Sequence, residues 1–225
     1  MATMNGWSKS ALKAVRLGLL AAVVIGAWKV EHSDAAHVVQ IPISAAVRTE
    51  SGSAFNVIVM SWDQQESPSP LRLQWSNSHV PVRGAGLGPL AGAFAYALDR
   101  LGPMHRPTGT LSLSVQSVTP MSSEAPGAGA ALAVGFLAVL KGERLISGIA
   151  LTGTLEPTGR IGSVTRVADK MKAAAQGGYR LLLVPRGQLP APRVNLVRFG
   201  MESGLVLREV GTVDEAYEIM TGKKL

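Results

Sequence analysis

The stretch of sequence that most restricts the fold is PGAGAALAVGFLAVLKG, residues 126–142. From Gly127 to Leu140 every side chain is apolar or absent, over a length that makes about four turns of helix. A helix without a polar face has to be covered by other elements on most of its sides. Gly142, just beyond Lys141, suits the end of such a helix. The sequence therefore predicts a domain that encloses one small-residue helix.

Strand and helix patterns alternate on both sides of this helix. Before it, we predict strands at 38–47, 54–62, 71–75 and 110–118, and a helix that starts at Pro89 and is stopped by Gly102 and Pro103. After it, we predict strands at 146–151, 180–184 and 206–210, a turn at 157–159, and a helix at 166–176. Thr212 and Glu215 have the spacing of a capping box that opens a last helix. These patterns indicate an α+β domain.

The length of the chain allows one such domain and an appendage. With 225 residues, of which 47% are hydrophobic, the chain can bury one core of about 150–190 residues. We assign residues 1–36 to the appendage and its linker, and residues 37–225 to the domain.

The appendage has the order of an export signal. Lys9, Lys13 and Arg16 precede an apolar run from Leu17 to Trp28. That run would span about 18 Å as a helix, against about 30 Å of membrane hydrocarbon. It becomes long enough to span only if residues 11–15 join it while Arg16 reaches the interface.

A cleaved signal peptide and a retained membrane anchor therefore both stay open. Residues 33–35, Ser-Asp-Ala, form a candidate cleavage site. In either case the basic flank is expected to stay cytoplasmic, so the domain lies on the exported side of the membrane.

Composition argues against several functions. The chain has no cysteine and four scattered histidines, so we expect no metal site and no cofactor. The net charge is +7, but four of the 22 Lys and Arg residues lie within the first 29 positions, and the other 18 face 15 Asp and Glu. Nucleic-acid binding depends on concentrated positive charge, so we do not expect a nucleic-acid partner.

Several landmarks between residues 119 and 185 resemble the proteolytic domain of the Lon family, and they fall in one register. They read Pro126-Gly127-Ala128-Gly129, Leu151-Thr152-Gly153-Thr154, Gly159, Lys170 and Leu181-Leu182-Leu183-Val184-Pro185. The resemblance implies the fold of that proteolytic domain, an α+β fold of the ribosomal protein S5 domain 2-like type. It also implies a ring-forming homo-oligomer, with a hexameric ring as the expected form.

The family uses a Ser/Lys dyad, and the resemblance assigns its positions here. The nucleophile falls at Gly127, the lysine base 43 residues later at Lys170, and the threonine that bonds the amine at Thr152. Glu124 replaces the acidic residue that precedes the serine. A desolvated amine with a lowered pKa removes the serine proton in such a dyad. Glycine has no hydroxyl, so the covalent route is closed at this position.

Each of these residues also has an ordinary structural explanation. Gly127 could serve only a tight turn, and Thr152 could bond a backbone group at a strand end. Lysines are mostly solvated. However, Val167 and Met171 recur with Lys170 at helical spacing, which predicts partial burial of the lysine.

The sequence thus predicts a catalytically inactive Lon-like domain, exported or membrane-anchored, that acts as a binding or assembly module. Its expected partners are further copies of itself, a membrane protein, or an unfolded peptide. Two alternatives stay open: an active peptidase that uses Ser122, Ser123 or a water-mediated mechanism, and a structural subunit of an envelope machine. The sequence contains no Gly-x-x-x-x-Gly-Lys-Ser/Thr phosphate loop, so unfolding driven by ATP would need a partner.

Overall fold

The computed structural model describes seven stretches of the chain: residues 37–46, 53–64, 71–75, 87–103, 105–116, 126–189 and 194–225. All of them belong to one compact unit, residues 34–225. The predicted signal or anchor within residues 1–36 lies outside the described residues, as do Ser122, Ser123 and Glu124. Within the described stretches, no helix is long and apolar enough to cross a membrane.

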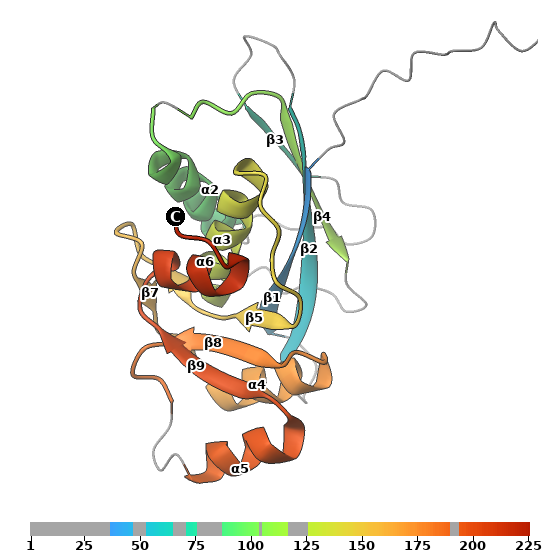
Figure 1. Ribbon diagram of the computed structural model, residues 1–225, viewed down its shortest axis with the longest axis vertical. Helices are drawn as coiled ribbons and strands as arrows, with labels where there is room; N and C mark the ends of the chain where they lie inside the picture. The colour runs from blue at the N-terminus through green and yellow to red at the C-terminus, as the bar shows by residue number, and fades with distance from the viewer. Residues whose placement is uncertain are drawn as a thin grey trace, which may run out of the picture. The chain divides into compact units, whose positions relative to one another are not determined.

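A four-stranded sheet forms one side of this unit, with the strand order β1-β2-β4-β3 (Figure 1). Its strands are β1 (His37–Ala46), β2 (Ser53–Asp63), β3 (Arg72–Trp75) and β4 (Thr110–Gln116). β2 pairs antiparallel with β1 and β4, whereas β3 runs parallel to β4. Alternate residues, such as Val39, Ile41 and Ile43, are buried, so one face of the sheet supplies core.

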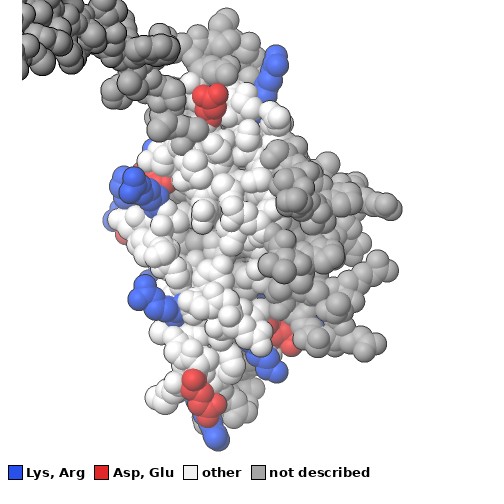
Figure 2. Space-filling model, turned by 90° about the vertical axis from the view of Figure 1, so that its right-hand side faces the viewer, with Lys and Arg blue, Asp and Glu red and all other residues white. Residues whose placement is uncertain are grey.

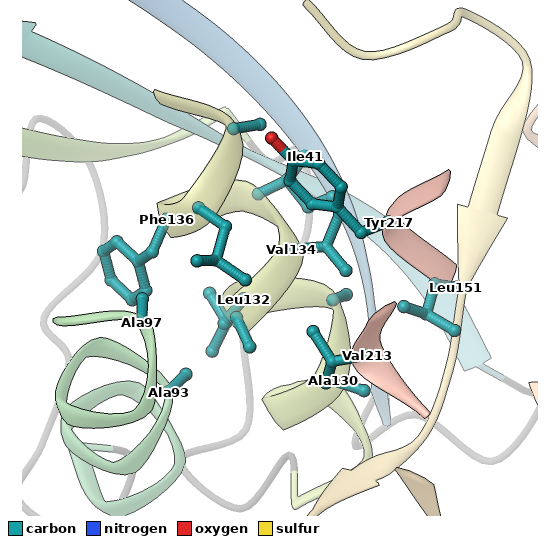
Figure 3. Close-up of a cluster of buried hydrophobic side chains, with 14 of the residues drawn as sticks. Ile41, Ala93, Ala97, Ala130, Leu132, Val134, Phe136, Leu151, Val213 and Tyr217 are labelled. Atoms are coloured by element: carbon teal, nitrogen blue, oxygen red, sulfur yellow. The ribbon is translucent and has the colours of Figure 1, made fainter. Parts of the chain in front are cut away.

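The predicted central helix is α3 (Gly129–Leu140), and it packs against this sheet. All 12 of its residues are buried, which confirms the enclosure that its composition predicts. Two other helices, α2 (Leu87–Leu101) and α6 (Val213–Thr221), cover it from other sides. Figure 3 shows the resulting cluster, in which Phe136 lies against α2 while Val213 and Tyr217 come from α6. The small side chains at the start of α3 allow these close approaches.

A three-stranded parallel sheet, in the order β5-β8-β9, and a short hairpin follow α3. The sheet consists of β5 (Ile149–Leu151), β8 (Leu181–Pro185) and β9 (Val206–Val210), and the hairpin of β6 (Thr154–Leu155) and β7 (Ile161–Gly162). Two helices connect the parallel strands: α4 (Val167–Gln176) and α5 (Val194–Ser203). A second, smaller core forms here around Met171, Leu182 and Leu205.

Two sequence predictions need correction. The strand predicted at 146–151 begins only at Ile149, because the amide of Ile146 donates to the carbonyl of Met220 and Gly148 has a φ of +81°. The central helix starts at Gly129, because Pro126–Ala128 form a 3₁₀ turn, η2. The turn predicted at 157–159 is confirmed, and it connects the two-residue strands of the β6–β7 hairpin.

The helix α5 has no counterpart among the predicted elements. Its segment contains Gly200 between apolar residues, and glycine lowers the helix propensity of a segment. Packing decides the outcome instead, since Phe199 contacts the second core and a Cβ on Gly200 would lie 2.8 Å from the carbonyl oxygen of Leu205.

The predicted cap of the last helix is present in part. The Thr212 hydroxyl oxygen accepts a hydrogen bond from the Glu215 amide at 3.2 Å. The Glu215 carboxylate accepts from the amide of Gly211 and from the guanidinium of Arg186, both at 2.9 Å. The reciprocal bond of a capping box is thus displaced by one residue.

Candidate active site

The site begins at η2, where the chain turns into α3. The first amides of a helix need external acceptors, and no side chain caps this helix. A loop after β5 supplies backbone instead: Ala130 N–H donates to the Gly153 carbonyl at 3.1 Å, and Gly153 N–H donates to the Gly127 carbonyl at 2.9 Å. Gly153 has to be glycine, because a Cβ there would overlap the side chain of Ile161. Gly127 is therefore held in a fixed place.

Thr152 lies directly beneath this turn. It follows β5, its side chain is fully buried, and its amide donates to the Leu183 carbonyl at 3.0 Å. Its hydroxyl donates to the Gly127 carbonyl at 3.3 Å. The threonine thus joins the end of a core strand to the turn that carries position 127.

Lys170 reaches the same place from α4. It shares the buried side of this helix with Met171, Ala173 and Ala174, and it is only 8% exposed. The burial predicted from its helical spacing is confirmed. Loss of hydration on burial is the main cause that lowers the pKa of the Lys170 amine, and the positive charge of Arg166 lowers it further.

The side chains of Lys170 and Thr152 both lie next to Gly127. A Cβ built on Gly127 would lie 3.5 Å from Lys170 Nζ, 3.5 Å from Thr152 Oγ1 and 3.0 Å from Val164 Cγ1. A hydroxyl oxygen lies one bond beyond a Cβ, so a serine at this position could bring its oxygen within hydrogen-bond reach of the amine. The three positions assigned from the sequence are therefore neighbours in space.

Residues 116–220 match the model of the Lon protease (S16) C-terminal proteolytic domain. This part of the chain is a Lon-family proteolytic domain. The match runs from the end of β4 to the end of α6 and includes Gly127, Thr152 and Lys170. A comparison with curated proteins found no match.

The helix that carries Lys170, α4, begins at a strained residue that was not predicted from the sequence. Arg166, the N-cap of α4, has a φ of +57° and is the one non-glycine residue with a positive φ in the described part of the chain. That conformation costs about 1–2 kcal/mol for a residue with a side chain. The Arg166 guanidinium donates to Asp169 at 2.7 Å, one residue before the lysine. An arginine at the start of a predicted helix is ordinary, so the sequence contains no signal for this strained conformation.

A second feature absent from the sequence analysis fixes Val164, the closest neighbour of position 127. The Gln188 side chain accepts from the Val164 amide at 2.7 Å and donates to the Val164 carbonyl at 2.8 Å. Glu209 in turn accepts from the amides of Gly187 and Leu189, on either side of Gln188. These hydrogen bonds join segments that are far apart in the sequence, so the local sequence pattern does not predict them.

The described residues contain no group of three or more His, Cys, Asp or Glu side chains that could hold a metal ion. Ser122, Ser123 and Glu124 fall in the stretch before η2 that lies outside the described residues. Chemically, the described site offers a buried amine suited to accept a proton, next to the glycine at position 127.

Proposed function

We propose that this Lon-family domain has lost its peptidase chemistry and acts as a binding or assembly module. One observation carries the proposal: the amine of Lys170 and the hydroxyl of Thr152 converge on Gly127, which has no side chain to attack a peptide carbonyl. Without a nucleophile at this position no acyl-enzyme can form there.

The test is to restore the missing group. Wild-type protein should leave an unfolded substrate such as casein intact, and Gly127→Ser should cleave it. Gly127→Ala, which adds the Cβ without the hydroxyl, and Gly127→Ser combined with Lys170→Met should both stay inactive.

Val164 has to be considered in this design. Its methyl group would lie 3.0 Å from the new Cβ, so it must move by a few tenths of an ångström. Gly127→Ser with Val164→Ala removes that contact and belongs in the series. Cleavage by the wild type that disappears in Lys170→Ala would contradict the proposal.

An active peptidase with another nucleophile is the second candidate, because the Thr152 hydroxyl also faces this position. Against it, Thr152 is fully buried and its hydroxyl is already bonded to the Gly127 carbonyl. Thr152→Val keeps the shape and removes the hydroxyl. Wild-type cleavage that is lost in this variant would favour the peptidase. Activity that labels Ser122 or Ser123 instead would assign one of those hydroxyls.

The partner and location belong to the same proposal. Basic residues before an apolar run support export of the domain, and family resemblance supports a ring of identical subunits. On the face shown in Figure 2, the Lys and Arg side chains of the described residues are scattered around a largely uncharged surface. This distribution favours protein partners over nucleic acid.

Fractionation of cells and sedimentation of the purified chain test these two expectations. We expect the domain on the exported side and a homo-oligomer in solution. A cytoplasmic domain or a monomer at working concentration would contradict the corresponding part of the proposal.

A further inference from the structure

β1 is an edge strand of the four-stranded sheet. It pairs with β2 along its whole length, from His37 opposite Trp62 to Ala46 opposite Ser53, and no described strand pairs with its other side. An edge strand presents unpaired backbone N–H and C=O groups to its surroundings.

Pro42 indicates which residues of β1 face outward. Proline cannot donate to a ladder, so within a sheet it occupies positions whose nitrogen faces away from the neighbouring strand. Antiparallel backbone groups alternate in direction along a strand. The backbone groups of Val38 and Gln40 therefore point to the same outer side as Pro42.

A groove of about 370 Å³ lies along this outer side, between β1 and the segment before and at the start of β5. Residues 144–149 line it from the opposite side, Tyr179 closes part of it, and the sheet supplies Val38, Val39, Gln40 and Pro42 from β1 and Val57 from β2. Val38 is 50% exposed and Ile146 is 47% exposed. Two large hydrophobic side chains thus flank the same groove without covering each other, which is typical of a binding surface.

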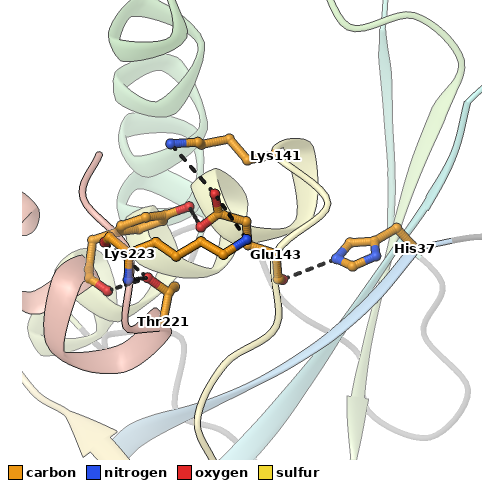
Figure 4. Close-up of polar contacts among 6 residues, drawn as sticks. His37, Lys141, Glu143, Thr221 and Lys223 are labelled. Atoms are coloured by element: carbon orange, nitrogen blue, oxygen red, sulfur yellow. Dashed lines mark hydrogen bonds and ion pairs between the residues drawn. The ribbon is translucent and has the colours of Figure 1, made fainter.

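The wall of the groove is anchored before any ligand arrives. The ring of His37 bonds the Glu143 carbonyl oxygen at 3.1 Å, which ties the start of β1 to the loop after α3 (Figure 4). The Tyr217 hydroxyl donates to the Glu143 carboxylate at 2.6 Å, and the Ile146 amide donates to the Met220 carbonyl at 2.7 Å. A preformed groove binds an extended chain at a smaller entropic cost than a flexible one.

The charge of the groove selects among extended chains. Of the residues that line it, only Arg144 is charged. The Arg180 guanidinium lies beside Gly148, which also lines the groove, so a second cation stands farther along the same wall. A segment with a carboxylate beside Arg144 matches this charge, and one with a cation there does not.

We propose that the outer edge of β1 binds an extended, acidic and apolar segment of a partner protein, which adds to the sheet as a further strand. Main-chain hydrogen bonds to Val38 and Gln40 provide affinity, as in other cases of strand addition. An apolar side chain of the partner lies between Val38 and Ile146, and its carboxylate faces Arg144. This surface is independent of the proposed loss of catalysis, because it uses none of the residues around position 127.

A pair of synthetic peptides tests the proposal on the full chain. Acetyl-Glu-Val-Thr-Val-Thr-amide should bind in a fluorescence anisotropy titration, and the same peptide with Lys in place of Glu should bind about fivefold more weakly. Methylation of the two backbone nitrogens that face β1 should weaken binding by about tenfold or more, because two hydrogen bonds are lost. Hydrogen exchange should slow at residues 38 and 40 when the acidic peptide binds.

Charge reversal in the protein completes the test. Arg144→Glu should reverse the preference between the two peptides, whereas Arg208→Glu, an equal change of net charge at an exposed site on β9, should leave it unchanged. Three results would overturn the proposal: no binding of the acidic peptide at about 1 mM, binding that backbone methylation does not affect, or equal effects of the two reversals.

Discussion

α3 and α4 both bury a helix face, but they do so with different residues. All 12 buried residues of α3 are apolar or glycine, whereas the buried positions of α4 are Lys170, Met171, Ala173 and Ala174. Packing explains every choice in α3. It does not explain the lysine in α4, because burial of an amine costs free energy that an apolar side chain of similar length would not cost.

The difference separates residues that make the fold from residues that point to a function. α3 follows directly after the turn that contains Gly127, and α4 places the amine of Lys170 next to that turn. The chain places this costly residue beside Gly127, which has no side chain. Substitutions in the two helices should therefore change stability in different ways.

The largest effect is expected in α3. Phe136 is fully buried and packs edge-to-face on Phe94, with ring centroids 5.2 Å apart. Phe136→Ala should lower the free energy of unfolding by about 3–5 kcal/mol in urea denaturation. Met171→Ala, in the smaller core beneath α4, should cost less, about 2–3 kcal/mol. A larger loss from Met171→Ala than from Phe136→Ala would show that the smaller core contributes more to stability than the core around α3.

The next effect has the opposite sign. Lys170→Met keeps the length of the side chain and removes the cost of burying the amine, so it should raise the free energy of unfolding near neutral pH. Lys172→Met, at an exposed position of the same helix, should change it by less than about 0.5 kcal/mol. If Lys170→Met is destabilising, the amine contributes more to the fold than its burial costs.

The pH dependence of stability shows whether the Lys170 amine causes this effect. Folding lowers the pKa of Lys170 below its ordinary value of 10.5, so the unfolded chain binds this proton more strongly. Stability therefore rises with pH between the lowered pKa and 10.5. The advantage of Lys170→Met should be largest below that window and should vanish above it. An advantage that does not change with pH would show that the amine is not the cause.

The sequence carried enough information for the centre of the fold and of the site. The apolar run at 127–140 has only one stable environment, a covered helix, and the spacing between Gly127, Thr152 and Lys170 belongs to one continuous segment. Each of these residues is positioned by the element next to it in the chain: η2, β5 and α4.

The parts that could not be predicted depend on contacts between distant segments. Gln188 holds Val164 from 24 residues away, and α5 is stabilised by Phe199 against the second core rather than by its own propensity. The outer edge of β1 is visible only when the strand order is known. Local patterns predict elements, whereas these features follow from how the elements meet.

The smallest effect concerns the strained residue that begins α4. Arg166→Ala keeps a side chain in the left-handed region and removes the charge, whereas Arg166→Gly removes both the charge and the strain. The glycine variant should therefore be more stable than the alanine variant by about 1 kcal/mol. Both variants should raise the pKa of Lys170, because the positive charge that lowers it is gone, and NMR titration of the labelled lysine measures that shift. If the pKa stays the same in both, desolvation alone sets it, and the strained arginine then serves only the turn into the helix.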